Sequence, residues 1–578
     1  TGHAGSNPAP GASKFPLRLL VCFHRLGVRR IRNILKELQG IYLRSDELSE
    51  EFEKVLVRTS RDAFVVFVGN FLSTLFLAVS AIIVARLLQP ENYGIYSVSL
   101  LVSSVLLLFT DFGIDSALVK YVSKFNALRK EEIVKEVVFK GLVLKLFVVS
   151  VVSVVNYLFA FELSTTLAER PELAYYVSLT SILTFSTALM NSFLAIMTAL
   201  GRMKLRSFVM IMQSLTKLLL SPLLVLLGFG VLGALLGHIA SYVVSCVAGF
   251  VVMLGYVKLK KPRENIVRSY DLVRFGLPLY LSGLLSVVLQ RFQYVMLARI
   301  ATNAELGNMQ AANQFISLIT LTIAPFSITL FPVFSSLEVR GAWREINELL
   351  NNVLKYMSIF TVQVALMIGV FSQDVIRLIY GRLYVTAPLY LTLMSVGYVY
   401  APFTVTLSAL LSGLGRTKDL LYSSAIQLLI MMPVSYLLIS SAGPEGYAIA
   451  LSLTGLPVLT YLLLVSRELN VSVSWRSLTK IYVISLLSVL IATPTQHLVE
   501  NYIIRLFTEL LISIITYITL LVFANSISWR DYEILKKTFG GIPLFGKVLS
   551  AFLEVGRLLL QVRDKYLGRV TSSDEGSS

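Results

Sequence analysis

Cationic side chains lie at positions that the hydrophobic pattern places deep in apolar segments. Lys217 falls near the middle of one such segment, with Gln213 one helical turn before it. Arg291 falls within another, and the amide side chains at a similar depth are Gln290, Asn313 and Gln314. A charge inside a bilayer is costly and marks a functional site by default. Lys217 and Arg291 are therefore candidates for binding an anionic group. The alternative for Lys217 is a structural pair with Asp111 or another carboxylate, and the alternative for the amides is hydrogen bonding between helices.

A second group of charges lies near the ends of two other apolar segments. Lys120, Lys140 and Lys145 could receive an anion at the membrane surface, although snorkelling to the interface explains them equally well. Asp111 and Asp115, together with Lys120, could form an internal ion-pair set or bind a coupling ion, either H⁺ or Na⁺. We expect no catalytic residue, metal ligand or bound cofactor, because the four histidines and two cysteines are scattered.

The composition is that of a membrane protein. The chain has 578 residues, of which 56% are hydrophobic and only 15% charged, and its mean hydropathy is +0.74. Soluble domains of ordinary composition are about one quarter charged. The net charge of +17 could suggest nucleic acid as a partner. We exclude that class, because the positive residues lie in short loops between hydrophobic segments, where membrane topology explains them.

The hydrophobic segments predict an all-α membrane protein with about fourteen spanning helices around a central cavity. The predicted spans cover residues 62–88, 93–120, 136–160, 174–200, 205–228, 231–256, 272–299, 304–334, 350–371, 386–413, 419–440, 444–466, 478–497 and 502–525. Lys and Arg gather in the loops of one face, whereas the opposite loops hold only Arg170, Arg377 and Arg382. This asymmetry predicts that both termini are cytoplasmic.

The pattern runs twice along the chain. Arg86 and Gly94 recur, with their neighbours, as Arg299 and Gly307, a shift of 213 positions. The segment 200–204 (LGRMK) recurs as 414–418 (LGRTK), and Gly230 and Gly233 recur as Gly443 and Gly446. The duplication predicts two six-helix lobes of the same orientation, with a substrate site between them. The predicted parts are an N-terminal segment with a basic amphipathic helix (1–60), a first lobe (61–257), a cytoplasmic linker (258–271), a second lobe (272–466), two further spans (467–527) and an amphipathic cytoplasmic tail (528–578).

The deep charges are not duplicated. A shift of 213 pairs Arg291 with Ala78 and Lys217 with Ile430. We therefore interpret the features that both lobes share as serving the fold, and the unshared charges as better candidates for substrate.

Specific motifs resemble those of a known family. The stretch VARLLQPENYGIYSVSLLVSSVLLLFTDFGIDSALVKYVS, residues 84–123, resembles the opening of the polysaccharide flippases of the multidrug/oligosaccharidyl-lipid/polysaccharide exporter superfamily. The FGLP sequence that begins at Phe275 resembles the start of that family's second lobe. The resemblance covers residues 61–525. It implies a flippase that moves a lipid-linked oligosaccharide, built on polyprenyl or dolichyl (pyro)phosphate, from the cytoplasmic to the outer leaflet by alternating access.

The resemblance also implies a setting and leaves alternatives open. It implies a monomer in the plasma membrane, in contact with membrane lipids and with glycan-assembly enzymes, and without catalytic activity of its own. A multidrug or small-molecule cation antiporter of the same superfamily is one alternative, although residues 63–85 lack the carboxylate that such transporters usually carry. A peptidoglycan-precursor lipid flippase is the other, although Arg86 is the only arginine that the early first lobe offers for its characteristic cluster.

Overall fold

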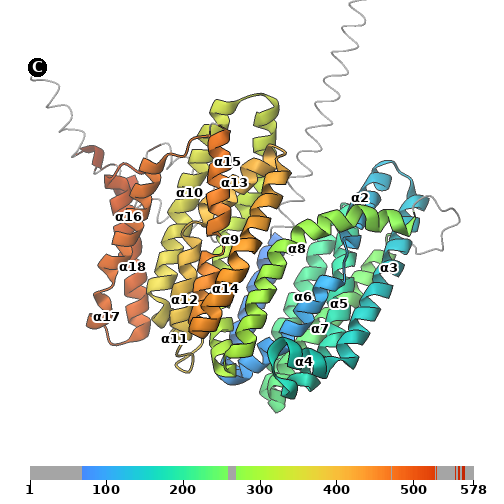
Figure 1. Ribbon diagram of the computed structural model, residues 1–578. Coiled ribbons are helices and arrows are strands. Elements are labelled where there is room, and N and C mark those ends of the chain that lie inside the picture. Colours follow the sequence, from blue (N-terminus) through green and yellow to red (C-terminus); the bar gives the residue numbers. More distant parts are fainter. Residues whose placement is uncertain are drawn as a thin grey trace, which may run out of the picture. The chain divides into compact units, whose positions relative to one another are not determined.

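The computed structural model describes residues 68–257, 268–469 and 471–527, together with Trp529 and short pieces of 554–565. Within these residues the chain forms helices and no strands (Figure 1). The predicted amphipathic helix of 1–60, most of the linker and most of the tail lie outside the described residues, so these three predictions stay predictions.

The first lobe begins with the long helical stretch Val68–Phe109, which ends in the 3-10 turn η1 (Leu107–Phe109). The helices that follow are α2 (Ile114–Ala127), α3 (Glu131–Leu158), α4 (Ala160–Ala168), the turn η2 (Pro171–Leu173), α5 (Ala174–Ala199), α6 (Met203–Leu224), the π-helical turn η3 (Val225–Phe229) and α7 (Gly230–Leu254). Each predicted span of this lobe thus falls on a helix or on two consecutive helices.

The second lobe and the helices after it follow the predicted pattern equally closely. They are α8 (Ser269–Ile300), α9 (Asn303–Val339), α10 (Trp343–Val370), α11 (Ser372–Ile379), α12 (Ala387–Ser395), η4 (Val396–Tyr398), α13 (Ala401–Gly413), α14 (Thr417–Leu453), α15 (Leu456–Glu468), α16 (Trp475–Ala492), α17 (Thr495–Leu498) and α18 (Tyr502–Phe523).

Three helical stretches each cover parts of two predicted spans, and each contains a break. The breaks have positive φ angles at Gln89 in Val68–Phe109, at Gly228 and Gly230 between α6 and α7, and at Gly443 in α14. Glycine adopts positive φ without steric cost, so it suits such turns. Gln89, Gly230 and Gly443 fall in loops predicted between consecutive spans, and Gly228 is the last residue of the predicted span 205–228.

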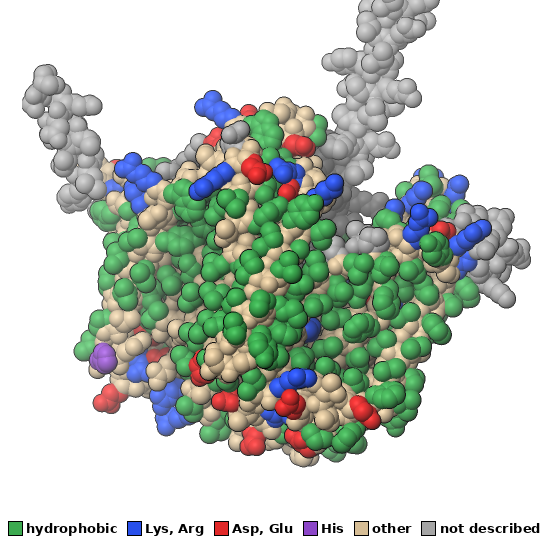
Figure 2. All heavy atoms as spheres, viewed as in Figure 1, with side chains coloured by type: hydrophobic (Ala, Val, Ile, Leu, Met, Phe, Trp, Pro, Cys, Tyr) green, Lys and Arg blue, Asp and Glu red, His purple; other side chains and the backbone are tan. Residues whose placement is uncertain are grey.

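The described helices meet the requirements for crossing a membrane. Eight of them are long and apolar enough by length and composition, and nine if the bent pair Ala387–Tyr398 and Ala401–Gly413 is one span. Hydrophobic side chains form a broad band over the described residues, and charged side chains lie above and below it (Figure 2). The all-α membrane fold is confirmed, whereas the exact number of fourteen spans stays a prediction.

Helix α8 joins the two lobes. It packs along α14 of the second lobe and also against α2 and α4 of the first (Figure 1). Near the start of α8, the backbone of Gly276 lies directly against that of Gly113. A side chain on either glycine would collide with the backbone of the other. The two C-terminal helices α16 and α18 pack on each other, and α16 packs on α10.

Candidate functional site

A polar cluster lies between α6, α7 and the first long helix of the first lobe. The Nζ atom of Lys217 is 3.4 Å from Nε2 of His238, and the other ring nitrogen of that histidine is 2.8 Å from the Tyr96 hydroxyl. The rings of Tyr96 and Tyr242 flank the histidine ring, with centroids 6.0 and 5.5 Å away. Within the described residues Lys217 forms no ion pair with a carboxylate. The cluster is an amine whose described neighbours are a histidine and tyrosines rather than carboxylates, which leaves it available to attract an anion.

Gln213 stands one helical turn from Lys217 and donates to the hydroxyl of Ser241, 3.2 Å away. In the second lobe, Gln427 makes the matching bond to the backbone carbonyl of Thr454, at 3.0 Å. These matching bonds fix the register between α6 and α14 at 214 positions, so the counterpart of Lys217 is Met431. The sequence comparison had paired Lys217 with Ile430, one residue away.

With this register for α6, and the shift of 213 positions for the helices around it, the two lobes carry opposite chemistry at this place. In the first lobe the positions are Tyr96, His238 and Lys217; in the second they are Met309, Leu451 and Met431. Met309 and Met431 are buried. An apolar set fills the same position without loss of fold, so the polar set is not required by the packing of this helix pair.

Arg291 lies in α8, the helix shared by both lobes. Its Nε atom is buried and has no hydrogen-bond partner, and Tyr294 and Tyr447 lie near its guanidinium group. The side chain of Asn313 contacts the Tyr447 hydroxyl. Arg291 and Asn313 thus both lie near Tyr447, in agreement with the similar depth predicted for them in the membrane.

The remaining amides of this predicted site have different surroundings. Gln290 is exposed, and Gln314, which is partly buried, has a partner of its own. Gln293 is fully buried and donates to the hydroxyls of Ser435, at 2.7 Å, and Thr454, at 3.3 Å. It therefore ties α8 to α14, which is the structural role that the sequence left open for the amides.

Asp111 and Asp115 form an internal ion-pair set, with Lys145 rather than Lys120. The Nζ atom of Lys145 lies 2.8 Å from Asp111 and 2.9 Å from Asp115, and its side chain is only 1% exposed. Ser192 donates a further hydrogen bond to Asp115. The three charged residues together carry one net negative charge, and Lys145 is fully engaged by them.

The other two lysines are also occupied. Lys120 lies over the ring of Phe275 in α8, with its Nζ atom 3.5 Å from the ring centroid, which is a cation–π contact between the lobes. Lys140 pairs with Glu136 at 2.6 Å, one helical turn earlier in α3. Lys217 and Arg291 therefore remain the predicted cations with the weakest pairing in the described part of the chain.

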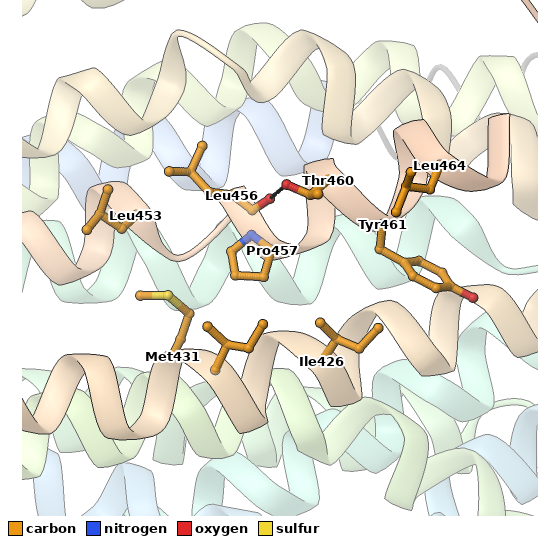
Figure 3. Close-up of a pocket in the computed structure, with 9 residues that line it drawn as sticks. Ile426, Met431, Leu453, Leu456, Pro457, Thr460, Tyr461 and Leu464 are labelled. Atoms are coloured by element: carbon orange, nitrogen blue, oxygen red, sulfur yellow. Dashed lines mark hydrogen bonds between the residues drawn. The ribbon is translucent and has the colours of Figure 1, made fainter. Parts of the chain in front are cut away.

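An apolar groove of about 480 Å³ lies between α14 and α15 (Figure 3). Its lining includes Met431, the apolar counterpart of Lys217, and Pro457 at the start of α15. At one end Tyr461 donates to Asp419, at 2.9 Å. The second lobe thus presents hydrocarbon at the level where the first lobe holds its buried amine.

Two family models match the chain. The family described as "Polysaccharide biosynthesis protein" matches residues 59–338, and the MatE family matches residues 278–437. The two matches together span residues 59–437, and they support placing the chain in the multidrug/oligosaccharidyl-lipid/polysaccharide exporter superfamily. The chain is therefore a multi-pass membrane transporter or flippase, and the families that it matches are transporters rather than enzymes.

Solved structures of this exporter superfamily share the fold. The lipid II flippase MurJ in its inward closed conformation is 17% identical, with a TM-score of 0.68 over 81% of this chain and 99% of that one. An inward-facing multidrug resistance MATE family transporter of the MOP superfamily is 18% identical, with a TM-score of 0.59 over 69% of this chain and 94% of the transporter. A relative in sequence is an uncharacterized membrane protein of Methanocaldococcus jannaschii, 22% identical over 391 residues, which are 64% of this chain and 76% of that protein.

Sequence reasoning found the deep charges but not their partners. It did not join His238 and Tyr96 to Lys217, and it paired the two aspartates with the wrong lysine. The signal for the first omission lay in the repeat, because His238 and Tyr96, like Lys217, have apolar counterparts.

Proposed function

We propose that this exporter moves a lipid-linked oligosaccharide from the cytoplasmic to the outer leaflet by alternating access of its two lobes. The cargo would be a glycan on polyprenyl or dolichyl (pyro)phosphate. Its head group would pass through the interior of the protein while the isoprenoid chain stays in hydrocarbon. A coupling ion, H⁺ or Na⁺, remains a prediction, as do the plasma-membrane location and the cytoplasmic termini.

The observation that carries this proposal is the half-buried amine of Lys217, which has no carboxylate partner in the described residues. Its one hydrogen-bond partner in the described residues is His238, at the long distance of 3.4 Å. A phosphate group that enters the membrane interior needs cationic or strong donor partners, because water is absent there. Arg291, whose Nε atom is also without a partner, offers a second such donor on the helix that both lobes share.

The charge at this site argues against a cation antiporter but does not distinguish between the two kinds of lipid flippase. A cation antiporter would need a carboxylate beside its cargo, whereas the first lobe holds Asp111 and Asp115 engaged by Lys145. A peptidoglycan-precursor flippase carries an anionic lipid as well, so the cationic site is compatible with it. The family match to polysaccharide biosynthesis proteins favours the oligosaccharide cargo.

The test is lipid translocation in liposomes. Purified protein would be reconstituted with a fluorescent polyprenyl-pyrophosphate oligosaccharide, and its protection from an added glycosidase would be measured over time. We expect wild type to translocate the lipid, and Lys217→Ala and Arg291→Ala each to lower the rate at least tenfold. Lys135→Ala is the matched control, because Lys135 forms a surface ion pair with Glu132.

Two other results would change the conclusion. If both variants translocated at the wild-type rate, the flippase would stand and the cationic site would be wrong. If the wild type moved no oligosaccharide lipid but exported organic cations against a proton or sodium gradient, the flippase itself would be wrong. A lipid II analogue in the same vesicles would separate the two kinds of glycan cargo.

A further inference from the structure

The repeated motif of the two lobes makes its contacts between the lobes. A side chain on Gly94 of the first lobe would collide with the backbone carbonyl of Asn303 in the second. Its counterpart Gly307 stands in the same relation to the carbonyl of Pro90. Because Pro90 and Asn303 are themselves 213 positions apart, the two contacts are copies of each other. The glycine of each lobe thus packs against the equivalent backbone carbonyl of the other lobe.

The repeated arginines Arg86 and Arg299 also contact the opposite lobe. Arg86 donates from its guanidinium group to the backbone carbonyls of Leu378 and Ile379 at the end of α11. Arg299 donates to the carbonyl of Thr166 in the last turn of α4. Thr166 and Ile379 are again 213 positions apart. Each arginine therefore binds the C-terminal end of the short helix that belongs to the opposite lobe.

The chemistry of these contacts suits a connection that forms and releases. The last carbonyls of a helix have no partner within it, and they carry the negative end of the helix dipole. A guanidinium group is well matched to such carbonyls because it presents several donors in one plane. The bonds of Arg86 and Arg299 are exposed, so water replaces them at small cost when the helix end moves away.

We propose that Arg86, Arg299, Gly94 and Gly307 form a two-point latch, which closes the transport pathway at one membrane face and opens once in each cycle. This inference rests on the alternating access of the proposed function. The loop charges predict that the latched face is the outer one. The sequence alone favoured a role in the fold for these repeated residues, whereas the contacts give them a role between the lobes.

The latch is adjacent to the buried amine. Tyr93 precedes Gly94, and its ring lies 6.0 Å from that of Tyr96, whose hydroxyl bonds to His238. The helix segment that carries the latch glycine thus also carries the tyrosine that supports the Lys217 site. Binding of an anion at Lys217 would act on this segment through His238 of α7, whose ring contacts both Lys217 and Tyr96.

The test measures whether the latched face opens, and it needs no substrate. Cys22 and Cys246 would be replaced by serine, and Ala301→Cys would place a small reporter at the latch, where Ala301 is 3% exposed. Labelling by a membrane-impermeant maleimide would be followed in oriented vesicles. We expect Arg86→Ala with Arg299→Ala to raise the labelling rate at least tenfold, and each single variant to raise it by less.

Controls separate opening from loss of structure. A reporter at Ala365→Cys, fully buried within the second lobe, must stay protected in every variant. Arg340→Ala, which removes an exposed arginine that takes no part in the latch, must leave the labelling of the latch reporter unchanged. Gly94→Val and Gly307→Val prevent closure by steric clash, and we expect them to label fastest of all.

The outcomes are distinct from those of the transport assay. If the double arginine variant labelled at the wild-type rate in folded protein, the latch would be refuted, even if a glycine variant failed to fold. If labelling rose as expected but no oligosaccharide lipid moved in liposomes, the latch would stand and the proposed cargo would fail.

Discussion

Replacement of Lys217 by methionine would be the sharpest test of whether its charge serves function or fold. The second lobe already carries methionine at the equivalent position, Met431, in the same helix pair. The change removes one long hydrogen bond to His238, and hydrogen bonds to charged groups contribute about 1.5–3 kcal/mol. It also removes a half-buried charge that has no carboxylate partner in the described residues, and withdrawing such a charge from water costs several kcal/mol.

These two effects have opposite signs and similar size. We expect Lys217→Met to leave the free energy of unfolding unchanged or to raise it by about 1–2 kcal/mol, while transport falls at least tenfold. Stability would be measured by denaturant unfolding in mixed micelles, and transport by the liposome assay. Lys135→Met, at an exposed ion pair, should change neither quantity.

The opposite pattern would refute the reasoning. If Lys217→Met unfolded more easily and the remaining folded protein still transported lipid normally, Lys217 would be a structural residue. The buried amine would then stabilise the first lobe, and the comparison with Met431 would have no bearing on cargo.

Three further substitutions test the buried polar groups. Lys145→Met should lower the free energy of unfolding by about 3–5 kcal/mol, because it leaves Asp111 and Asp115 without their counter-charge; restoration by a further Asp111→Asn change would confirm the cause. Tyr400→Phe should lower the free energy of unfolding by about 1–3 kcal/mol in the same measurement. The Tyr400 hydroxyl donates to the carbonyl of Ser452 and accepts from a backbone amide at the break between α14 and α15. Glu509→Gln should leave the melting temperature unchanged or higher, because both carboxyl oxygens are buried without a partner, and a large fall would contradict this.

Much of the fold could be predicted because hydropathy and backbone breaks are local. The turn at Gln89 precedes a proline, and the turns at Gly230 and Gly443 are duplicated glycines, so each was visible in the sequence. The partners of buried charges depend instead on which helix faces meet. Lys120 and Lys145 are the same residue type, yet Lys120 lies over the ring of Phe275 in α8 while Lys145 pairs with the two aspartates. Nothing in the spacing distinguishes these two directions.

The role of the repeated residues could not be predicted for a related reason. A duplicated residue such as Arg86 shows that both lobes need it, but not whether it contacts its own lobe or the other. The contacts in the structure answer the question, because each copy of the motif binds the opposite lobe.

The reciprocal contact between Gly94 and Gly307 has a consequence for the origin of the chain. In a symmetric dimer, a patch on one subunit meets the identical patch on the other, so one set of residues makes the whole interface. The two lobes meet in this way, through one short motif used twice. A half-length ancestor bearing that motif would already have contained a complete surface for pairing with its own copy. Within one fused chain the first half can carry a charge at Lys217 while the second carries hydrocarbon at Met431, a difference that two identical subunits cannot have.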